Sequence, residues 1–112
     1  MRSDTERLRD ILEAIENIEK YTKQGKQRFE QDELVYTWIV YHLQIIGEAS
    51  SAMSKTFMEN HLEIPWRDMI DFRNILVHEY FQIDSRIIWK VVTEELPNLK
   101  KMVLEILKKL HD

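Results

Sequence analysis

Hydrophobic residues recur every three or four positions along most of the chain, the spacing that gathers them on one side of an α-helix. The first such run predicts a helix over residues 4–23, and Gly25 inside the polar segment Lys23–Gln27 predicts a loop after it. A second, longer helix is expected from about Asp32, which suits an N-cap, to about Met58.

The second half of the chain repeats this pattern in shorter runs. A third helix is expected over Pro65–Glu79, because proline suits the first turn, where its missing N–H is not needed. Gln82–Ser85 is a short joint in which Asp84 is expected to cap a fourth helix that continues through Glu94. Pro97 either kinks that helix or opens a fifth one.

Length and composition favour the same fold class. The 112 residues suffice for one domain, and only 2 Gly and 2 Pro occur, too few for the turns of a many-stranded sheet. We therefore predict an all-α protein, an antiparallel bundle of four to five helices in a single domain over residues 1–112.

Several classes of site and location are excluded by what the chain lacks. The absence of Cys excludes disulfides, thiolate metal sites and a cysteine nucleophile. No stretch approaches the ~18 uninterrupted apolar residues of a membrane span. Met1–Arg7 contains acidic groups and leads into an amphipathic pattern, so we expect no signal peptide and a cytoplasmic protein.

Three residues of the second helix differ from the hydrophobic face around them. Apolar side chains from Leu34 to Met53 fall within one arc of the helix, and we expect them to form core. Gly47 lies inside this helix although glycine costs about 1 kcal/mol relative to alanine there, so we expect it to permit close approach of another helix. Glu48 lies at the rim of the apolar arc. His42 lies within the arc, where a hydrogen-bonded core histidine is expected.

Arg73 breaks the hydrophobic pattern of the third helix. On a helical wheel it lies at the centre of the apolar face, with Trp66 and Val77 on one side and Leu76 on the other. An unpaired guanidinium buried there would be strongly destabilising, and such violations of patterning tend to mark functional sites. The alternative is a structural ion pair with a carboxylate of another helix, such as Glu48.

A narrow polar stripe occupies another side of the same helix. Arg67, Asp71, Asn74 and His78 follow one another at spacings of four, three and four residues. The ordinary reason for such a stripe is a solvated helix surface, on which Arg67 and Asp71 form an ion pair. Functionally, Arg73 can bend toward the stripe, or two copies of the helix can meet so that Arg73 of one chain and His78 of the other face a shared cleft.

These residues form a recognisable motif. Ile64–Trp66 followed by Phe72–Tyr80, with the sequence FRNILVHEY, resembles the signature of the HepT toxins, a branch of the HEPN domain superfamily. The shared element is Arg, a polar residue, three residues, His, one residue and Tyr, and it is matched without a gap. Ile46–Ala49, Ile88–Trp89 and Leu96–Pro97 also resemble that family, so the resemblance covers nearly the whole chain.

The resemblance implies an endoribonuclease toxin of a type VII HepT/MntA-like toxin–antitoxin system, a homodimer with its motif helices face to face that needs no metal or cofactor. RNA supplies its own nucleophile, the 2′-hydroxyl. His78 suits general acid–base catalysis near neutral pH, and Arg73 suits bidentate contact with the scissile phosphate. Asn74 would orient the imidazole or donate to a phosphate oxygen, and Glu48 and Asp71 are candidate supporting residues.

Tyr80 has a separate role in this resemblance. The partner in such systems is an Mnt-type minimal nucleotidyltransferase antitoxin, which transfers adenylate to the motif tyrosine and silences the toxin. Adenylate on Tyr80 would block RNA entry and compete for Arg73. The alternative is that Tyr80 and Phe81 simply close one end of the core.

The residues alone leave two other functions open. One is a non-catalytic HEPN module that binds a nucleotide or positions a nucleotidyltransferase partner, with Arg73 and His78 gripping a phosphate. The other is a structural helical dimer whose polar stripe is an interface network. The net charge of −4 argues against RNA binding by charge alone, so positive charge has to be concentrated locally. The lysines near the C-terminus could supply this charge, or could simply interact favourably with the negative end of a helix dipole on a solvated face. They are Lys100, Lys101, Lys108 and Lys109.

Overall fold

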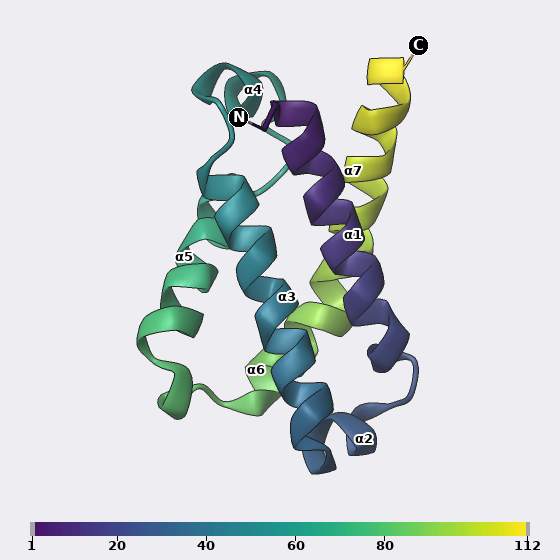
Figure 1. Ribbon diagram of the computed structural model, residues 1–112, viewed down its shortest axis with the longest axis vertical. Helices are drawn as coiled ribbons and strands as arrows, with labels where there is room; N and C mark the ends of the chain where they lie inside the picture. Colours follow the sequence, from purple (N-terminus) through teal and green to yellow (C-terminus); the bar gives the residue numbers. More distant parts are fainter. Residues whose placement is uncertain (1, 112) are drawn as a thin grey trace.

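The computed structural model describes residues 2–111, except for the side chains of Phe81 and His111, and over that range it is helical with no strand (Figure 1). The α-helices are α1 (Asp4–Thr22), α2 (Lys26–Gln31), α3 (Glu33–Ser51), α4 (Lys55–Asn60), α5 (Trp66–His78), α6 (Ser85–Lys90) and α7 (Leu96–His111). A 3-10 turn, η1 (Tyr80–Gln82), follows α5, and a π-helical segment, η2 (Val91–Glu95), joins α6 to α7. The predicted all-α fold class is confirmed. None of the described helices is long and apolar enough to cross a membrane.

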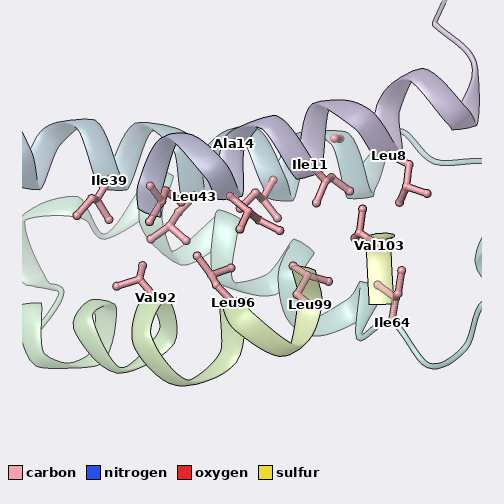
Figure 2. Packing of buried hydrophobic residues seen from close by; sticks show 14 of the residues in the cluster. Leu8, Ile11, Ala14, Ile39, Leu43, Ile64, Val92, Leu96, Leu99 and Val103 are labelled. Carbon is pink, nitrogen blue, oxygen red and sulfur yellow. The ribbon is translucent and has the colours of Figure 1, made fainter. Parts of the chain in front are cut away.

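The hydrophobic core forms where α1 packs against both α3 and α7 (Figure 2). Apolar residues at helical spacing on each of these helices meet there, and each fully buried Leu or Ile side chain stabilises the fold by about 2 kcal/mol. The apolar side chains that are 0% exposed on these helices are Leu8, Ile11, Ile15, Ile18, Ile39 and Val103. This core supports α3, which in turn supports the rest of the molecule.

α5 lies at the side of the bundle, and α3 is the long helix against which it packs (Figure 1). Its buried anchors are Leu76, which is fully buried, and Trp66, whose indole N–H donates to the carbonyl of His61 at 3.0 Å. Its bounds agree with the predicted third helix to within one residue at each end. The helix that contains Arg73 is therefore held mainly through one face.

The predicted helix from Asp32 to Met58 is wrong in extent, because it is two helices. Asp32 caps α3 as predicted, since its carboxylate accepts hydrogen bonds from N–H groups of the first turn. α3 ends at Ser51, where the hydroxyls of Ser50 and Ser51 donate to carbonyls of the preceding turn at 2.7 and 2.9 Å. Serine hydroxyls compete with the backbone ladder in this way, and hydrophobic periodicity does not register that competition.

Ser54 starts the next helix. Its hydroxyl accepts a hydrogen bond from the N–H of Phe57 in α4, and its own N–H donates to the carboxylate of Asp4 in α1 at 2.9 Å. The same residue therefore begins α4 and ties it to the N-terminal helix.

Two connections also differ from the sequence prediction. The loop predicted over Lys23–Gln27 ends earlier, because α2 begins at Lys26, directly after Gly25 with its φ of 99°. Only glycine adopts that left-handed conformation without steric cost. Two roles were predicted for Pro97, and the structure combines them: helical backbone continues from α6 through the π-helical segment, and Pro97 lies in the first turn of α7 directly after it.

The predicted core face of α3 is too wide at its beginning. Leu34 is 81% exposed and Trp38 is 36% exposed, because the first turns of α3 extend past the end of α1 (Figure 1). Trp38 covers the edge of α1 instead, and its indole N–H donates to the carbonyl of Asn17 at 2.8 Å. His42 is buried as predicted, with its Nδ1 hydrogen donated to the Trp38 carbonyl at 2.8 Å.

Asp84 caps α6, as predicted, and this contact depends on pH. Its carboxylate accepts hydrogen bonds from the guanidinium of Arg86 at 2.7 Å and from the Arg86 N–H at 2.9 Å. These contacts lower the pKa of Asp84 to about 2. A carboxyl whose pKa is lower in the folded than in the unfolded state stabilises the fold above its unfolded value, about 4, and this contribution is lost as the pH falls toward 2.

Asp84→Asn and Arg86→Gln are therefore both expected to lower the midpoint of thermal unfolding at neutral pH. The difference from the parent protein should narrow as the pH falls from about 4 to about 2, because the ion pair is then lost in the parent as well. Thermal unfolding followed by circular dichroism over this pH range measures the effect. A difference that stays constant with pH would contradict the assignment.

Candidate functional site

The candidate site is built on α5, and one contact with α3 sets its position. A Cβ added to Gly47 of α3 would lie 2.1 Å from the Cβ of Arg73 and 3.1 Å from the carbonyl oxygen of Met69. The first distance is far shorter than any non-bonded contact between carbon atoms. Gly47 permits the close helix approach that the sequence predicts, and the residue it faces is Arg73 itself.

The Arg73 side chain starts in this contact and ends near the surface, with 32% of its area exposed. Its Nη2 lies 3.7 Å from Oε1 of Glu48, and its Nη1 donates a hydrogen bond to Oδ1 of Asn74 at 3.1 Å. The predicted ion pair with Glu48 and the predicted bend toward the polar stripe are thus both present. The anomaly on the apolar face is a guanidinium held between two helices.

Stability alone does not account for an arginine at this position. An ion pair this exposed contributes about 0–1 kcal/mol. Against this, the Nε atom of Arg73 is buried and has no hydrogen-bond partner among the described residues, and a buried donor left unpaired costs about 1–3 kcal/mol. The hydrogen bond to Asn74 adds about 0.5–1.5 kcal/mol, so the gains and the cost nearly cancel, and the guanidinium contributes little net stability.

The polar stripe faces solvent, since Arg67, Asp71, Asn74 and His78 are all exposed. The expected ion pair between Arg67 and Asp71 is absent, and Asp71 has no hydrogen-bond or ion-pair partner among the described side chains. The absence of this ion pair costs the fold little stability, because a pair between exposed side chains one helical turn apart contributes only about 0.2–0.5 kcal/mol. Asp71 therefore supports neither Arg73 nor His78 within one chain.

His78 is the last residue of α5, and its side chain is exposed. Among the described side chains it has neither a hydrogen-bond nor an ion-pair partner. Asn74, which was expected to orient the imidazole or contact a phosphate, accepts a hydrogen bond from Arg73 and makes none to His78. The structure therefore brings Arg73, Asn74 and Glu48 together and leaves His78 accessible at the end of the same helix.

Tyr80 follows in η1, and its side chain is 37% exposed. Burial and the neighbouring Tyr80 phenol raise the pKa of the Tyr36 hydroxyl, which places the two rings near each other. Tyr80 is thus partly buried and also reachable from solvent, so this exposure agrees with both predicted roles, the modified tyrosine and the residue that closes the end of the core. The side chain of Phe81, named with it, lies outside the described residues.

The other side of α5 borders an apolar groove of about 280 Å³ between α5, η2 and α7. Phe72 and Met69 of α5 line it, and carboxylates stand among its lining residues at Asp68, Glu94 and Glu95. None of the motif residues from Arg73 to Tyr80 lines this groove. Sequence periodicity did not reveal it, because its walls come from segments far apart in the chain.

The lysines of α7 do not act as one group. Lys100 donates to Oε1 of Glu19 in α1 at 2.7 Å, and this hydrogen bond raises the pKa of Lys100. Lys101, Lys108 and Lys109 are exposed. Within the described part of the chain, no three acidic or histidine side chains cluster as a metal site would require.

Comparison with known proteins identifies the family. The chain matches the family model described as "Ribonuclease HepT-like" over residues 11–106. The protein named "Probable ribonuclease HepT" from Thermococcus cleftensis is 43% identical over 100 residues, which cover 88% of this chain and 91% of that protein. Proteins that are named as RNases in Caldanaerobacter subterraneus and Methanocaldococcus jannaschii are 39% and 38% identical, over 91% and 86% of this chain and 92% and 89% of their own lengths. No solved structure matches the chain.

The extent of these matches agrees with the motif residues found in α5 and η1. The family model spans the helices that form the core and the helix that holds Arg73 and His78. The chain belongs to the ribonuclease HepT-like family, a branch of the HEPN superfamily.

Proposed function

We propose that this protein is a metal-independent endoribonuclease toxin of a type VII HepT/MntA-like toxin–antitoxin system, acting as a homodimer on cellular RNA in the cytoplasm. The observation that supports it best is the Arg73 guanidinium, which is bound to Asn74 with little net gain in stability and lies on the same helix as an accessible His78. The names of the relatives as RNases support the substrate class.

The cleavage chemistry requires a base, an acid and a cation at the phosphate. His78 takes the proton of the 2′-hydroxyl, the 2′ oxygen bonds to phosphorus, and the bond from phosphorus to the 5′ oxygen breaks as that oxygen receives the proton back from the same imidazole. The products are a 2′,3′-cyclic phosphate and a 5′-hydroxyl. Arg73 stabilises the charge that develops on the phosphate oxygens, while Asn74, whose Oδ1 is occupied by Arg73, has its N–H groups left to donate to the phosphate.

RNA is expected on the side of α5 that holds Arg67, Asn74 and His78. The groove on the other side contains the carboxylates of Asp68, Glu94 and Glu95, which repel phosphates. Lys101, Lys108 and Lys109 of α7 are exposed and available for long-range attraction. Placing the phosphate at Arg73 reconciles a net charge of −4 with an RNA substrate, because the positive charge needed is local.

A homodimer through α5 would complete the site. Within one chain His78 has no contact with Arg73, and α5 exposes apolar side chains, with Ile75 at 43% and Val77 at 41%. Two copies of α5 meeting across a two-fold axis would cover apolar surface and place Arg73 of one chain opposite His78 of the partner. A small domain that buries limited surface also gains stability from such an interface.

A second candidate function is a non-catalytic HEPN module that binds a nucleotide or positions a nucleotidyltransferase partner. It is favoured by one observation, that a phosphate-binding pair, Arg73 and Asn74, is already assembled in a single chain while His78 stands apart. Tight nucleotide binding without RNA cleavage would select this function over the toxin.

The purified protein is expected to cleave RNA in the presence of a metal chelator. Arg73→Ala and His78→Ala should each reduce cleavage by at least about 100-fold, because one loses transition-state charge stabilisation and the other proton transfer. His61→Gln and Arg2→Gln, the matched controls outside α5, should retain parental activity. Gel analysis of RNA products measures this, with circular dichroism to verify folding. Parental activity in the His78 variant would disprove its catalytic role.

Mixing the two inactive chains tests whether the site is shared. If Arg73 of one chain acts with His78 of the partner, a dimer of one Arg73→Ala chain and one His78→Ala chain retains one intact site. Random exchange should then restore about a quarter of the parental activity, since half of the dimers are mixed and each has one of two sites. If both residues act within one chain, the mixture stays inactive, which would contradict the shared cleft.

Co-expression with an Mnt-type nucleotidyltransferase is expected to add adenylate to Tyr80. The tyrosyl oxygen attacks the α-phosphorus of ATP, the bond to the β-phosphate breaks, pyrophosphate leaves and the phenol loses its proton. Intact mass spectrometry should show the added mass, and the modified protein should no longer cleave RNA. Tyr80→Phe should abolish the addition. Tyr41→Phe is the matched control, because Tyr41 is more exposed, at 59% against 37%. Modification that persists in Tyr80→Phe would refute the assignment.

A further inference from the structure

The contact at Gly47 differs from ordinary side-chain packing. A Cβ at position 47 would lie 2.1 Å from the Cβ of Arg73 and 2.6 Å from its Cγ. The two Cβ atoms are fixed to their backbones, so rotation of the Arg73 side chain cannot relieve the first contact. The third neighbour, the carbonyl oxygen of Met69 at 3.1 Å, is also backbone of α5. Any side chain at position 47 therefore moves α5 itself.

The surroundings of α5 allow such a displacement. α3 is the long helix against which α5 packs, and the side toward η2 and α7 is an open groove of about 280 Å³. α5 lies at the side of the bundle (Figure 1), so a helix pushed away from α3 moves toward solvent and meets no packed neighbour. The distance of α5 from the core is thus set at the α3 contact, and Arg73 sits in that contact.

The guanidinium is constrained at the same place. Its Nε is covered and has no partner among the described residues, so a phosphate has to be met by the terminal nitrogens Nη1 and Nη2. Asn74 holds Nη1, and the carboxylate of Glu48 lies 3.7 Å from Nη2, too far for a hydrogen bond. Glu48 therefore attracts Nη2 without occupying its donors.

We propose that Gly47 and Glu48 are positioning residues for Arg73: the missing side chain at 47 sets where α5 and the arginine stem lie, and the carboxylate at 48 aims the guanidinium edge at the phosphate. This inference rests on the proposed ribonuclease function. It assigns to adjacent residues of α3 a role in the reaction, although neither has to touch the RNA.

Gly47→Ala is the direct test. It must move α5 by roughly an ångström, and a displacement of that size at a catalytic group can cost about 100-fold in rate. We expect kcat to fall by about that factor while KM changes little, because the substitution removes no charge and leaves Arg67 and the exposed lysines of α7 in place. Thr37→Ala, at an exposed position of the same helix, is the control and should leave both constants unchanged. Parental kcat in a folded Gly47→Ala protein would overturn the proposal.

Glu48→Gln tests the second residue without risk to the fold, because the side chain is 56% exposed. A positioning role predicts a several-fold lower kcat with an unchanged unfolding midpoint. If the carboxylate only repelled RNA, the substitution would lower KM and leave kcat unchanged, and this result would overturn its assignment.

A readout that needs no activity examines the contact itself. Gly47→Ala should lower the unfolding midpoint, and adding Arg73→Gly should restore much of the loss, whereas adding Arg73→Ala, which keeps the Cβ, should not. Equal effects of both second substitutions would overturn the contact. Failure of the parent protein to cleave RNA would instead overturn the proposed function, so the two failures are distinguishable.

Discussion

The separation between α3 and α5 depends on the absence of a side chain at Gly47, and the candidate site depends on that separation. α5 packs mainly on α3, so the contact with the Cβ of Arg73 determines how close the helix lies to the core. A glycine inside a helix weakens it by about 1 kcal/mol relative to alanine. The structure accepts this cost at the point where the arginine of the motif is placed.

The arginine itself shows why the site is not a product of stability. Its ion pair with Glu48 is long and exposed, its Nε is buried without a partner, and its hydrogen bond goes to the neighbouring Asn74. These contacts hold the guanidinium in one place more than they stabilise the fold. Preorganised charge of this kind is what stabilisation of a transition state requires, because the cost of fixing it is met during folding.

The two sides of α5 have different chemistry. One side presents Asn74, which is bound to Arg73, and the exposed His78, and the other borders an apolar groove whose carboxylates disfavour phosphates. For the proposed ribonuclease this leaves RNA one approach to the helix, even though the chain as a whole is acidic. Tyr80 lies just past the end of α5, so the proposed adenylate on it would bring negative charge to the end of that helix.

The sequence by itself determined the helical fold, the bounds of α5, the buried His42 and the Arg73 motif, because these follow from local periodicity, capping and residue type. It did not determine where α3 ends, how exposed Leu34 is, or that Gly47 faces Arg73. Those depend on which helices meet and at what distance, and two residues far apart in the chain have no local signal of their contact. Only the tertiary structure decided that the arginine that breaks the pattern of one helix lies against the glycine inside the other.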